Sequence, residues 1–126
     1  MAKFKVAFGD GQVFTIHLRG DSTKTVAALV ESLPIKSTAS RWGDEVYFKV
    51  PFHAPLETDA RQDMEPGEVA FWPDGDALAL FFGPTPISKG ALPRAYSPCN
   101  IVGRIEGELA GLKHVEDGCK LELRLA

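Results

Sequence analysis

Two large aromatic residues stand among charged residues in segments that alternate in the way β-strands do. Tyr47 shares a predicted strand face with Glu45, and Trp72 shares one with Glu68. An aromatic ring on a polar face forms either a platform for a ligand or a packing contact beneath a loop. Phe82 ends the strand that follows Trp72, and there it either reaches the same edge or packs in the core. We predict that Tyr47, Trp72 and Phe82 wall a ligand-binding cleft.

Arg41 and Glu45 are the candidate catalytic residues. The Arg41 guanidinium offers five fixed N–H donors, which suit an amide or a carboxylate. The competing interpretation of Arg41 is a solvated ion pair that contributes little. If Glu45 is buried beside Trp72, its pKa rises and it can act as a general acid or base. If it is not buried, Glu45 is an ordinary surface carboxylate.

Patterns typical of other catalytic chemistries are missing from the sequence. His17, His53 and His114 are far apart and lack the spacing of metal ligands. Neither Ser97 nor Cys99 lies in a nucleophile elbow. No glycine-rich loop opens a helix, as a phosphate site requires. We therefore expect no metal and no cofactor.

The segment 67–86, GEVAFWPDGDALALFFGPTP, predicts the element that positions Trp72 and Phe82. Two apolar strands flank the turn Pro73-Asp74-Gly75-Asp76, and the second strand is apolar on both faces. Such a strand is covered on two sides. The edge where the strands end is a place where apolar rings stay partly uncovered, so the hairpin indicates a binding edge.

The remaining pattern predicts a mainly β protein with one main helix and one short helix. Alternation predicts further strands over 3–8, 13–19, 45–50, 101–105 and 119–125. An apolar stripe predicts a helix over 23–33 that Asp21 or Ser22 caps and Pro34 ends, and a short helical turn is expected over 108–114. The segments 51–66, long enough to act as a flap, and 83–99 are predicted to be irregular. We expect a closed antiparallel barrel, because closure removes exposed sheet edges.

Composition narrows the partners and the location. The 126 residues fit a single domain, and the net charge is −3 with 14 scattered basic residues. Nucleic acid or an anionic membrane calls for a basic stripe, so we expect neither partner. The N-terminal segment has no apolar signal core, and Cys99 and Cys119 are expected to be free thiols, with Cys119 facing the core. These features predict a cytoplasmic protein, and they leave its oligomeric state open.

Three segments carry a family resemblance: GDEVYF (43–48), the hairpin at 67–86 and NIVGRIEG (100–107). They resemble short prokaryotic cyclophilin-like proteins of unestablished function. The order of hairpin, helix, central strands and closing strand is similar to the cyclophilin fold over nearly the whole chain. The resemblance implies one cyclophilin-like domain over residues 1–126, with the helix at 23–33 plugging the barrel.

The catalytic residues of cyclophilins do not carry over. Cyclophilins isomerise Xaa-Pro bonds by holding the proline ring in an apolar pocket while an arginine polarises the amide. The corresponding strand here, 45–50, has neither that arginine nor the glutamine of the family motif, and 95–102 lacks the pocket Trp and His. Arg41 is the candidate replacement for the arginine. What the resemblance implies is the scaffold with aromatic walls, and fold alone does not carry function.

Three functions remain open from the sequence. The leading hypothesis is a domain that binds a small molecule or an extended peptide without established catalysis. The second is a peptidyl-prolyl isomerase or another weak acid–base enzyme that uses Arg41 and Glu45. The third is a structural or oligomer-forming module in which Trp42 and Trp72 lie in a protein interface.

Overall fold

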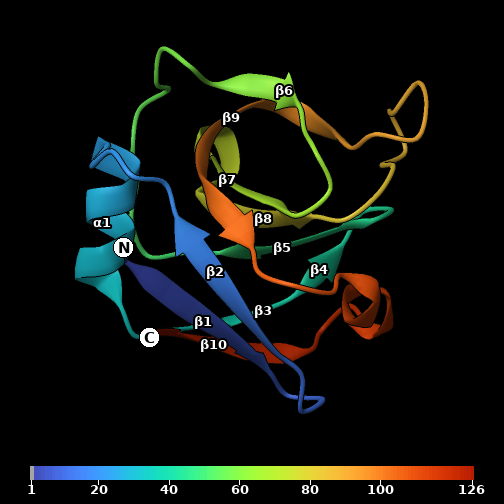
Figure 1. Ribbon diagram of the computed structural model, residues 1–126, viewed down its shortest axis with the longest axis horizontal. Coiled ribbons are helices and arrows are strands. Elements are labelled where there is room, and N and C mark those ends of the chain that lie inside the picture. The colour runs from blue at the N-terminus through green and yellow to red at the C-terminus, as the bar shows by residue number, and fades with distance from the viewer. Residues whose placement is uncertain (1) are drawn as a thin grey trace.

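Alternating apolar and polar residues build the strands of a mainly β protein, as the sequence predicts. In the computed structural model, which describes residues 2–126, the chain forms a strongly curved ten-stranded antiparallel sheet with a single α-helix (Figure 1). The strands are β1 (Lys3–Phe8), β2 (Val13–Leu18), β3 (Ile35–Thr38), β4 (Ser40–Arg41), β5 (Glu45–Lys49), β6 (Arg61–Asp63), β7 (Glu68–Trp72), β8 (Ala77–Phe81), β9 (Arg94–Ile105) and β10 (Lys120–Leu125). The helices are α1 (Lys24–Ser32) and two 3-10 helices, η1 (Pro73–Gly75) and η2 (Ala110–His114).

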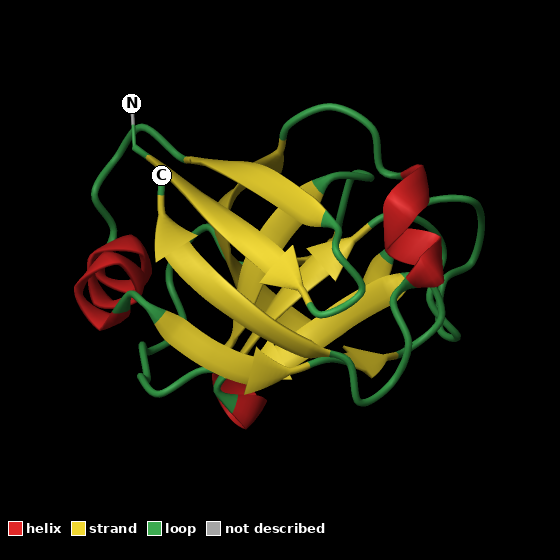
Figure 2. Ribbon diagram, turned by 90° about the horizontal axis from the view of Figure 1, so that it is seen from below, coloured by secondary structure: helices red, strands yellow, loops and turns green. Residues whose placement is uncertain are grey.

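The main core fills the inside of the curved sheet. Its largest contributions come from alternate residues of five strands: Phe4, Val6, Phe14, Ile16, Val46, Phe48, Val69, Phe71, Leu78 and Leu80. Val26 and Leu29 of α1 cover one end of this core, and Leu112 of η2 is buried at the other (Figure 2). Both cysteines are free, with Cys99 buried and Cys119 packed against the core as predicted.

The sheet is open, so the expectation of a closed barrel is not confirmed. Its strand order, β3-β10-β1-β2-β9-β7-β8-β5-β4, is a linear path whose two end strands are neighbours in the sequence. Only Ala39 separates β3 from β4, whereas a hairpin needs a loop of at least about two residues. The end strands therefore cannot pair with each other. Across the gap, the Ser37 hydroxyl donates a hydrogen bond to the Lys49 carbonyl at 2.7 Å.

Thr23 caps α1, and the caps predicted at Asp21 and Ser22 are wrong. Thr23 Oγ1 accepts a hydrogen bond from the Val26 N–H at 3.2 Å, which satisfies one of the free donors of the first turn. The helix ends ahead of Pro34, as predicted, since a proline there removes a donor. Within residues 2–126, no helix combines the length and the apolar content that crossing a membrane requires.

Strand β9 is far longer than predicted. The sequence analysis leaves 83–99 irregular, but β9 begins at Arg94 and pairs first with β6 and then with β7 and β2. Pro98 lies inside it, where the register with β6 shifts. A proline is tolerated at such an irregular edge because no ladder hydrogen bond is lost there. The first half of β9 thus carries residues that the sequence analysis assigns to a loop.

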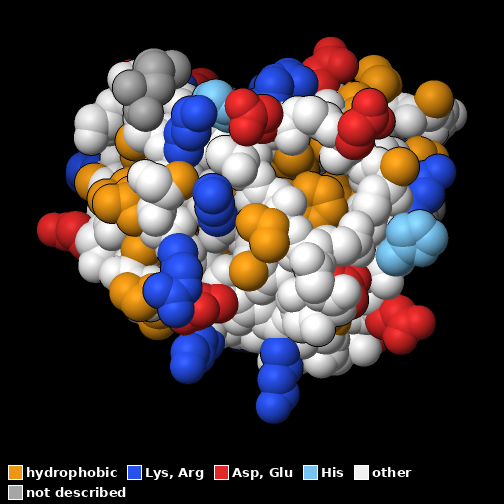
Figure 3. Space-filling model, turned by 60° about the horizontal axis from the view of Figure 1, so that its bottom comes forward, with side chains coloured by type: hydrophobic (Ala, Val, Ile, Leu, Met, Phe, Trp, Pro, Cys, Tyr) orange, Lys and Arg blue, Asp and Glu red, His pale blue; other side chains and the backbone are white. Residues whose placement is uncertain are grey.

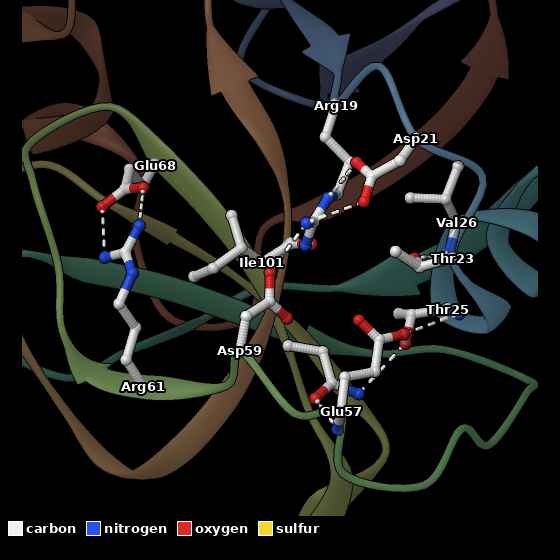
Figure 4. Close-up of polar contacts among 11 residues, drawn as sticks. Arg19, Asp21, Thr23, Thr25, Val26, Glu57, Asp59, Arg61, Glu68 and Ile101 are labelled. Carbon is white, nitrogen blue, oxygen red and sulfur yellow. Dashed lines mark hydrogen bonds and ion pairs between the residues drawn. The ribbon is translucent and has the colours of Figure 1, made fainter.

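The loop between β5 and β6 is pinned to the rest of the molecule and does not stand free as the predicted flap (Figure 4). Thr25 Oγ1 donates to the Glu57 carboxylate at 2.6 Å, and the Glu57 N–H donates to Asn100 Oδ1 at 2.8 Å. The Arg19 guanidinium reaches Asp59 at 2.7 Å. Helix α1, strand β9 and the residue that follows β2 therefore all hold this loop.

The strands β3, β10 and β1 turn charged residues to the solvent. In the ladder Lys36 lies opposite Glu122, and Lys5 lies opposite Arg124. On the face shown in Figure 3, several Lys and Arg side chains form a loose row beside uncharged, apolar and acidic side chains.

Candidate binding site

A second apolar cluster lies on the outer face of the sheet, opposite the main core. Because successive residues of a strand point to opposite faces, β7 and β8 contribute to both clusters. The outer cluster contains Met64, Ala70, Ala79, Phe81, Ala95 and Cys99, with Tyr47, Trp72 and Ile101 packed against it. Strand β9 folds over this face together with β6. The prediction that the second hairpin strand is covered on two sides is therefore confirmed: every residue of β8 is buried.

A cavity of about 150 Å³ opens at the edge of this outer cluster. Its lining residues come from four segments: Trp42, Glu45, Tyr47, Trp72, Ala95, Tyr96 and Cys99. Tyr47 lies opposite Ala79 in the ladder, and Ala79 lies opposite Ala70. Both alanines are buried in the outer cluster, beside the cavity. The structure thus brings together three of the predicted site residues, Glu45, Tyr47 and Trp72.

Aromatic rings form most of the cavity wall and hold one another in place. The Tyr96 ring lies edge-to-face with both Trp42 and Trp72, at centroid distances of 5.9 and 6.0 Å. Trp72 Nε1 donates to Ser97 Oγ at 2.6 Å, which fixes the orientation of the indole. Such edge-to-face pairs stabilise by about 0.5–1.5 kcal/mol beyond their area burial.

Glycine at position 75 makes room for the Trp72 ring. Trp72 ends β7 and Gly75 belongs to η1, the turn of the central hairpin. A Cβ atom built on Gly75 would overlap the six-membered ring of Trp72. The turn sequence Pro73-Asp74-Gly75 therefore contributes directly to the position of this wall of the cavity.

Glu45 is the one acidic residue in the lining of the cavity, and it is buried. Its side chain is only 8% exposed, and its Oε1 atom has no hydrogen-bond partner among the described residues. Burial raises the pKa of Glu45 to about 8, because the charged form loses its hydration. No Lys, Arg or His belongs to the lining. The condition set in the sequence analysis, a Glu45 carboxyl buried beside Trp72, is met.

The Cys99 thiol shares the cavity with Glu45 but is not a nucleophile at neutral pH. Burial, with the nearby Glu45 carboxyl as a second cause, raises the pKa of Cys99 to about 12. Only the thiolate attacks an electrophile or binds a soft metal. Cys99 therefore serves as a neutral part of the wall.

The structure separates Arg41 and Phe82 from the other three candidates. Arg41 Nη1 donates to the carbonyl groups of Val115 at 2.8 Å and Lys113 at 3.1 Å, and its other donors reach Gly43 O. The guanidinium lies 5.2 Å from the centre of the Phe82 ring, and Phe82 packs in the main core. Neither residue lines the cavity. Arg41 holds backbone segments together in place of presenting free donors to a ligand.

Two aromatic residues of the cavity are absent from the site predicted from sequence. The sequence analysis places Trp42 only in the protein interface of its third hypothesis. Tyr96 belongs to the segment 83–99, which the sequence analysis predicts to be irregular because prolines interrupt the alternation of β9. At 68% exposure Tyr96 is a large ring left open to solvent, a signal that only the structure reveals.

The histidines lie apart and pair with single carboxylates. His17 lies 3.1 Å from Glu106, and His53 lies 2.6 Å from Asp76. Across residues 2–126, no three His, Cys, Asp or Glu side chains come together in a way that could hold a metal ion.

The molecule is a mainly β protein in which one curved antiparallel sheet encloses the main core and carries an aromatic cavity on its outer face. The family model described as Cyclophilin-like matches residues 2–124. The chain therefore belongs to the Cyclophilin-like family, as the motifs in the sequence indicated.

A solved structure agrees with this assignment. The chain is similar to the solution structure of the hypothetical protein AF2241 from Archaeoglobus fulgidus, with 37% sequence identity and a TM-score of 0.83. The similarity covers 99% of this chain and 95% of that one. Comparison with curated proteins gave no significant match.

Proposed function

We propose that this domain binds a small molecule, or one side chain of an extended peptide, in the cavity walled by Trp42, Tyr47, Trp72 and Tyr96. The observation that supports the proposal most strongly is the convergence of four aromatic side chains from separate segments on one open cavity. A cavity of about 150 Å³ is the size that admits a molecule as large as benzene.

The energetics of the wall favour a ligand. Trp42, Tyr47 and Trp72 are half-buried, and Tyr96 is exposed. A ligand that covers their apolar surface gains roughly 25 cal/mol for each Å² removed from water. The rings are already fixed by their mutual contacts and by the Trp72–Ser97 hydrogen bond, so little ordering free energy is spent on binding.

Binding can be tested by NMR on the full chain, because both tryptophans of the protein line the cavity. The probes are p-cresol, butylamine, N-methylacetamide, acetate and an Ala-Pro dipeptide. We expect at least one of them to shift the indole N–H signals of both Trp42 and Trp72. The substitution Trp72→Ala should abolish that binding, whereas Leu56→Ala, at an exposed apolar position, should leave it unchanged. The proposal is overturned if neither these probes nor choline shift the indole signals, or if the affinity is unchanged in Trp72→Ala.

Proton transfer by Glu45 is a second candidate function. A carboxyl group with a pKa of about 8 in an apolar cavity is suited to give or take a proton near neutral pH. In prolyl isomerisation the Glu45 acid would lend its proton to the prolyl amide nitrogen during rotation and take it back afterwards, and NMR exchange of the cis and trans forms of the Ala-Pro dipeptide tests this. Catalysis by Glu45 predicts faster exchange with the protein, a loss of that gain in Glu45→Gln, and no loss in Arg41→Ala. An exchange rate that the protein does not change excludes prolyl isomerisation.

A further inference from the structure

The Glu45 carboxyl is buried without a partner, which is unusual for a side chain of this kind. Moving an isolated carboxylate out of water costs several kcal/mol unless a charge or hydrogen bonds compensate. Among the described residues, nothing donates to Glu45 Oε1, and no basic side chain lines the cavity. The charged form of Glu45 therefore has no partner in the protein itself, and a cationic occupant of the cavity would supply one.

Glu68 shows what a compensated carboxylate looks like on the same face of the sheet. It is 5% exposed, and Arg61 forms an ion pair with it (Figure 4). Glu68 Oε1 also accepts a hydrogen bond from the Glu65 N–H at 2.7 Å. Burial alone would raise the pKa of Glu68, but the hydrogen bonds from Arg61 and Glu65 outweigh it, and the pKa is lowered. Glu45, with comparable burial, has no such partners.

Like the Glu45 carboxylate, the aromatic walls favour a positively charged ligand. The faces of Trp and Tyr rings carry partial negative charge, so they attract cations, most strongly where water is excluded. Two indoles and two phenols line this cavity together with one carboxyl group. An anion placed here would face both the rings and Glu45 and would find no positively charged side chain.

We propose that the ligand of this cavity carries an alkylated ammonium group, which the four rings surround and which the Glu45 carboxylate neutralises. This inference rests on the proposed binding function and names the chemistry of its ligand. Alkyl groups on the nitrogen suit the apolar rings, while a bare ammonium ion would lose its hydration without enough acceptors in return.

Binding of such a cation is linked to the release of one proton. Because the pKa of Glu45 is about 8, the group is mostly protonated at pH 7, and the cation displaces that proton into the solvent. The other titratable side chains in the lining are Tyr47, Tyr96 and Cys99, and burial keeps the Cys99 thiol neutral over this range. The affinity for a permanently charged ligand should therefore rise about tenfold between pH 7 and pH 9.

The test compares choline with its neutral isostere 3,3-dimethylbutan-1-ol, using the tryptophan fluorescence of the full chain. At pH 9 we expect choline to bind about tenfold or more tightly than the alcohol. Glu45→Gln should remove that preference and flatten the pH dependence, while Glu122→Gln on the distant strand β10 removes an equal charge and should change neither. Should Glu45→Gln fail to fold, the rise in affinity with pH in the unmodified protein remains a separate measurement of the same linkage.

The outcomes distinguish the two proposals. Equal affinity for choline and the alcohol, or a preference that survives Glu45→Gln, overturns the inference and leaves a neutral binding cavity. If neither ligand binds but another of the NMR probes does, only the inference fails. If no probe binds at all, the proposed function fails as well. An N-acetyl-trimethyllysine amide identifies the source of the group: tighter binding than choline assigns it to a peptide, and weaker binding assigns it to a free small molecule.

Discussion

Glu45 couples the stability of this protein to pH, because burial acts on the charged form of the side chain alone. Its pKa rises from 4.5 when solvated to about 8 in the fold. Below pH 4.5 the group is protonated in both the folded and the unfolded chain, so it does not lower the free energy of unfolding. Above pH 4.5 the unfolded chain loses this proton while the folded chain keeps it, and this difference favours the unfolded chain.

We predict that the free energy of unfolding falls as the pH rises from 4.5 to about 8 and that Glu45→Gln removes this fall. The loss is on the order of 5 kcal/mol, from the size of the pKa change. Denaturant unfolding of both proteins at several pH values measures it, and their difference isolates Glu45 from the other titrating groups. Parallel curves for the two proteins would contradict the buried position of this carboxyl.

At this scale the sequence predicts part of the cavity. Alternation alone places Glu45 and Tyr47 on one strand face and Trp72 on a polar face, and the structure brings all three together. It does not reach Tyr96, because prolines interrupt the pattern around it, nor the role of Trp42 in the wall. Arg41 and Phe82 lie close to the site in sequence but are turned away from it by contacts that no local pattern reveals.

The central hairpin is the element on which the cavity depends most. Strands β7 and β8 and the turn between them appear as the sequence predicts, because both strands are strongly apolar and the turn contains proline and glycine. Strands β3, β4 and β6 were not predicted. They are two to four residues long and carry polar residues, so tertiary pairing and not local preference makes them strands.

Gly75→Ala tests how the hairpin turn positions the wall. The added Cβ overlaps the Trp72 ring and must displace it, so we expect a destabilisation of about 1–3 kcal/mol. The Trp72 indole N–H signal should move, because its hydrogen bond to Ser97 depends on the position of the ring. Both effects can be measured, by denaturant unfolding and by NMR.

Gly90→Ala is the matched control for this substitution. A Cβ atom at Gly90 meets nothing within 4 Å, so the change should stay within about 0.5 kcal/mol and leave the Trp72 signal in place. Equal effects of the two substitutions would show that Gly75 is not needed for the ring.

At the scale of the whole molecule, side-chain hydrogen bonds bridge the gap between the two edge strands of the open sheet. β3 and β4 are the two edge strands of the sheet, and they do not pair with each other. Arg41, on β4, binds the carbonyl groups of Lys113 and Val115, just before β10 begins. The Arg41 N–H also donates to the Asp117 carboxylate at 2.5 Å. The cyclophilin-like architecture is thus predictable from motif order, whereas the gap and its closure by Arg41 are not, since they depend on contacts distant in sequence.

Arg41→Ala should therefore weaken the fold while sparing the cavity. Loss of the hydrogen bonds to two backbone carbonyls is expected to cost about 1–3 kcal/mol, measured by denaturant unfolding. Arg124→Ala, which removes an exposed ion pair with Glu122, should cost less than about 0.5 kcal/mol. A loss of ligand affinity in Arg41→Ala as large as that in Trp72→Ala would instead mean that Arg41 takes part in binding.

The open gap has a consequence for how wide the cavity entrance can become. Tyr47 and Trp72 stand on strands with a paired neighbour on each side, so they cannot shift without breaking backbone hydrogen bonds. Trp42 follows β4, an edge strand that pairs with β5 alone, and lies in the short β4–β5 connection, where its N–H donates to the Glu45 carbonyl at 3.0 Å. If the proposed ligand binds, we therefore expect Trp42 to set the limit on its size, and similar folds with a longer or shorter β4–β5 connection to accept ligands of a different width.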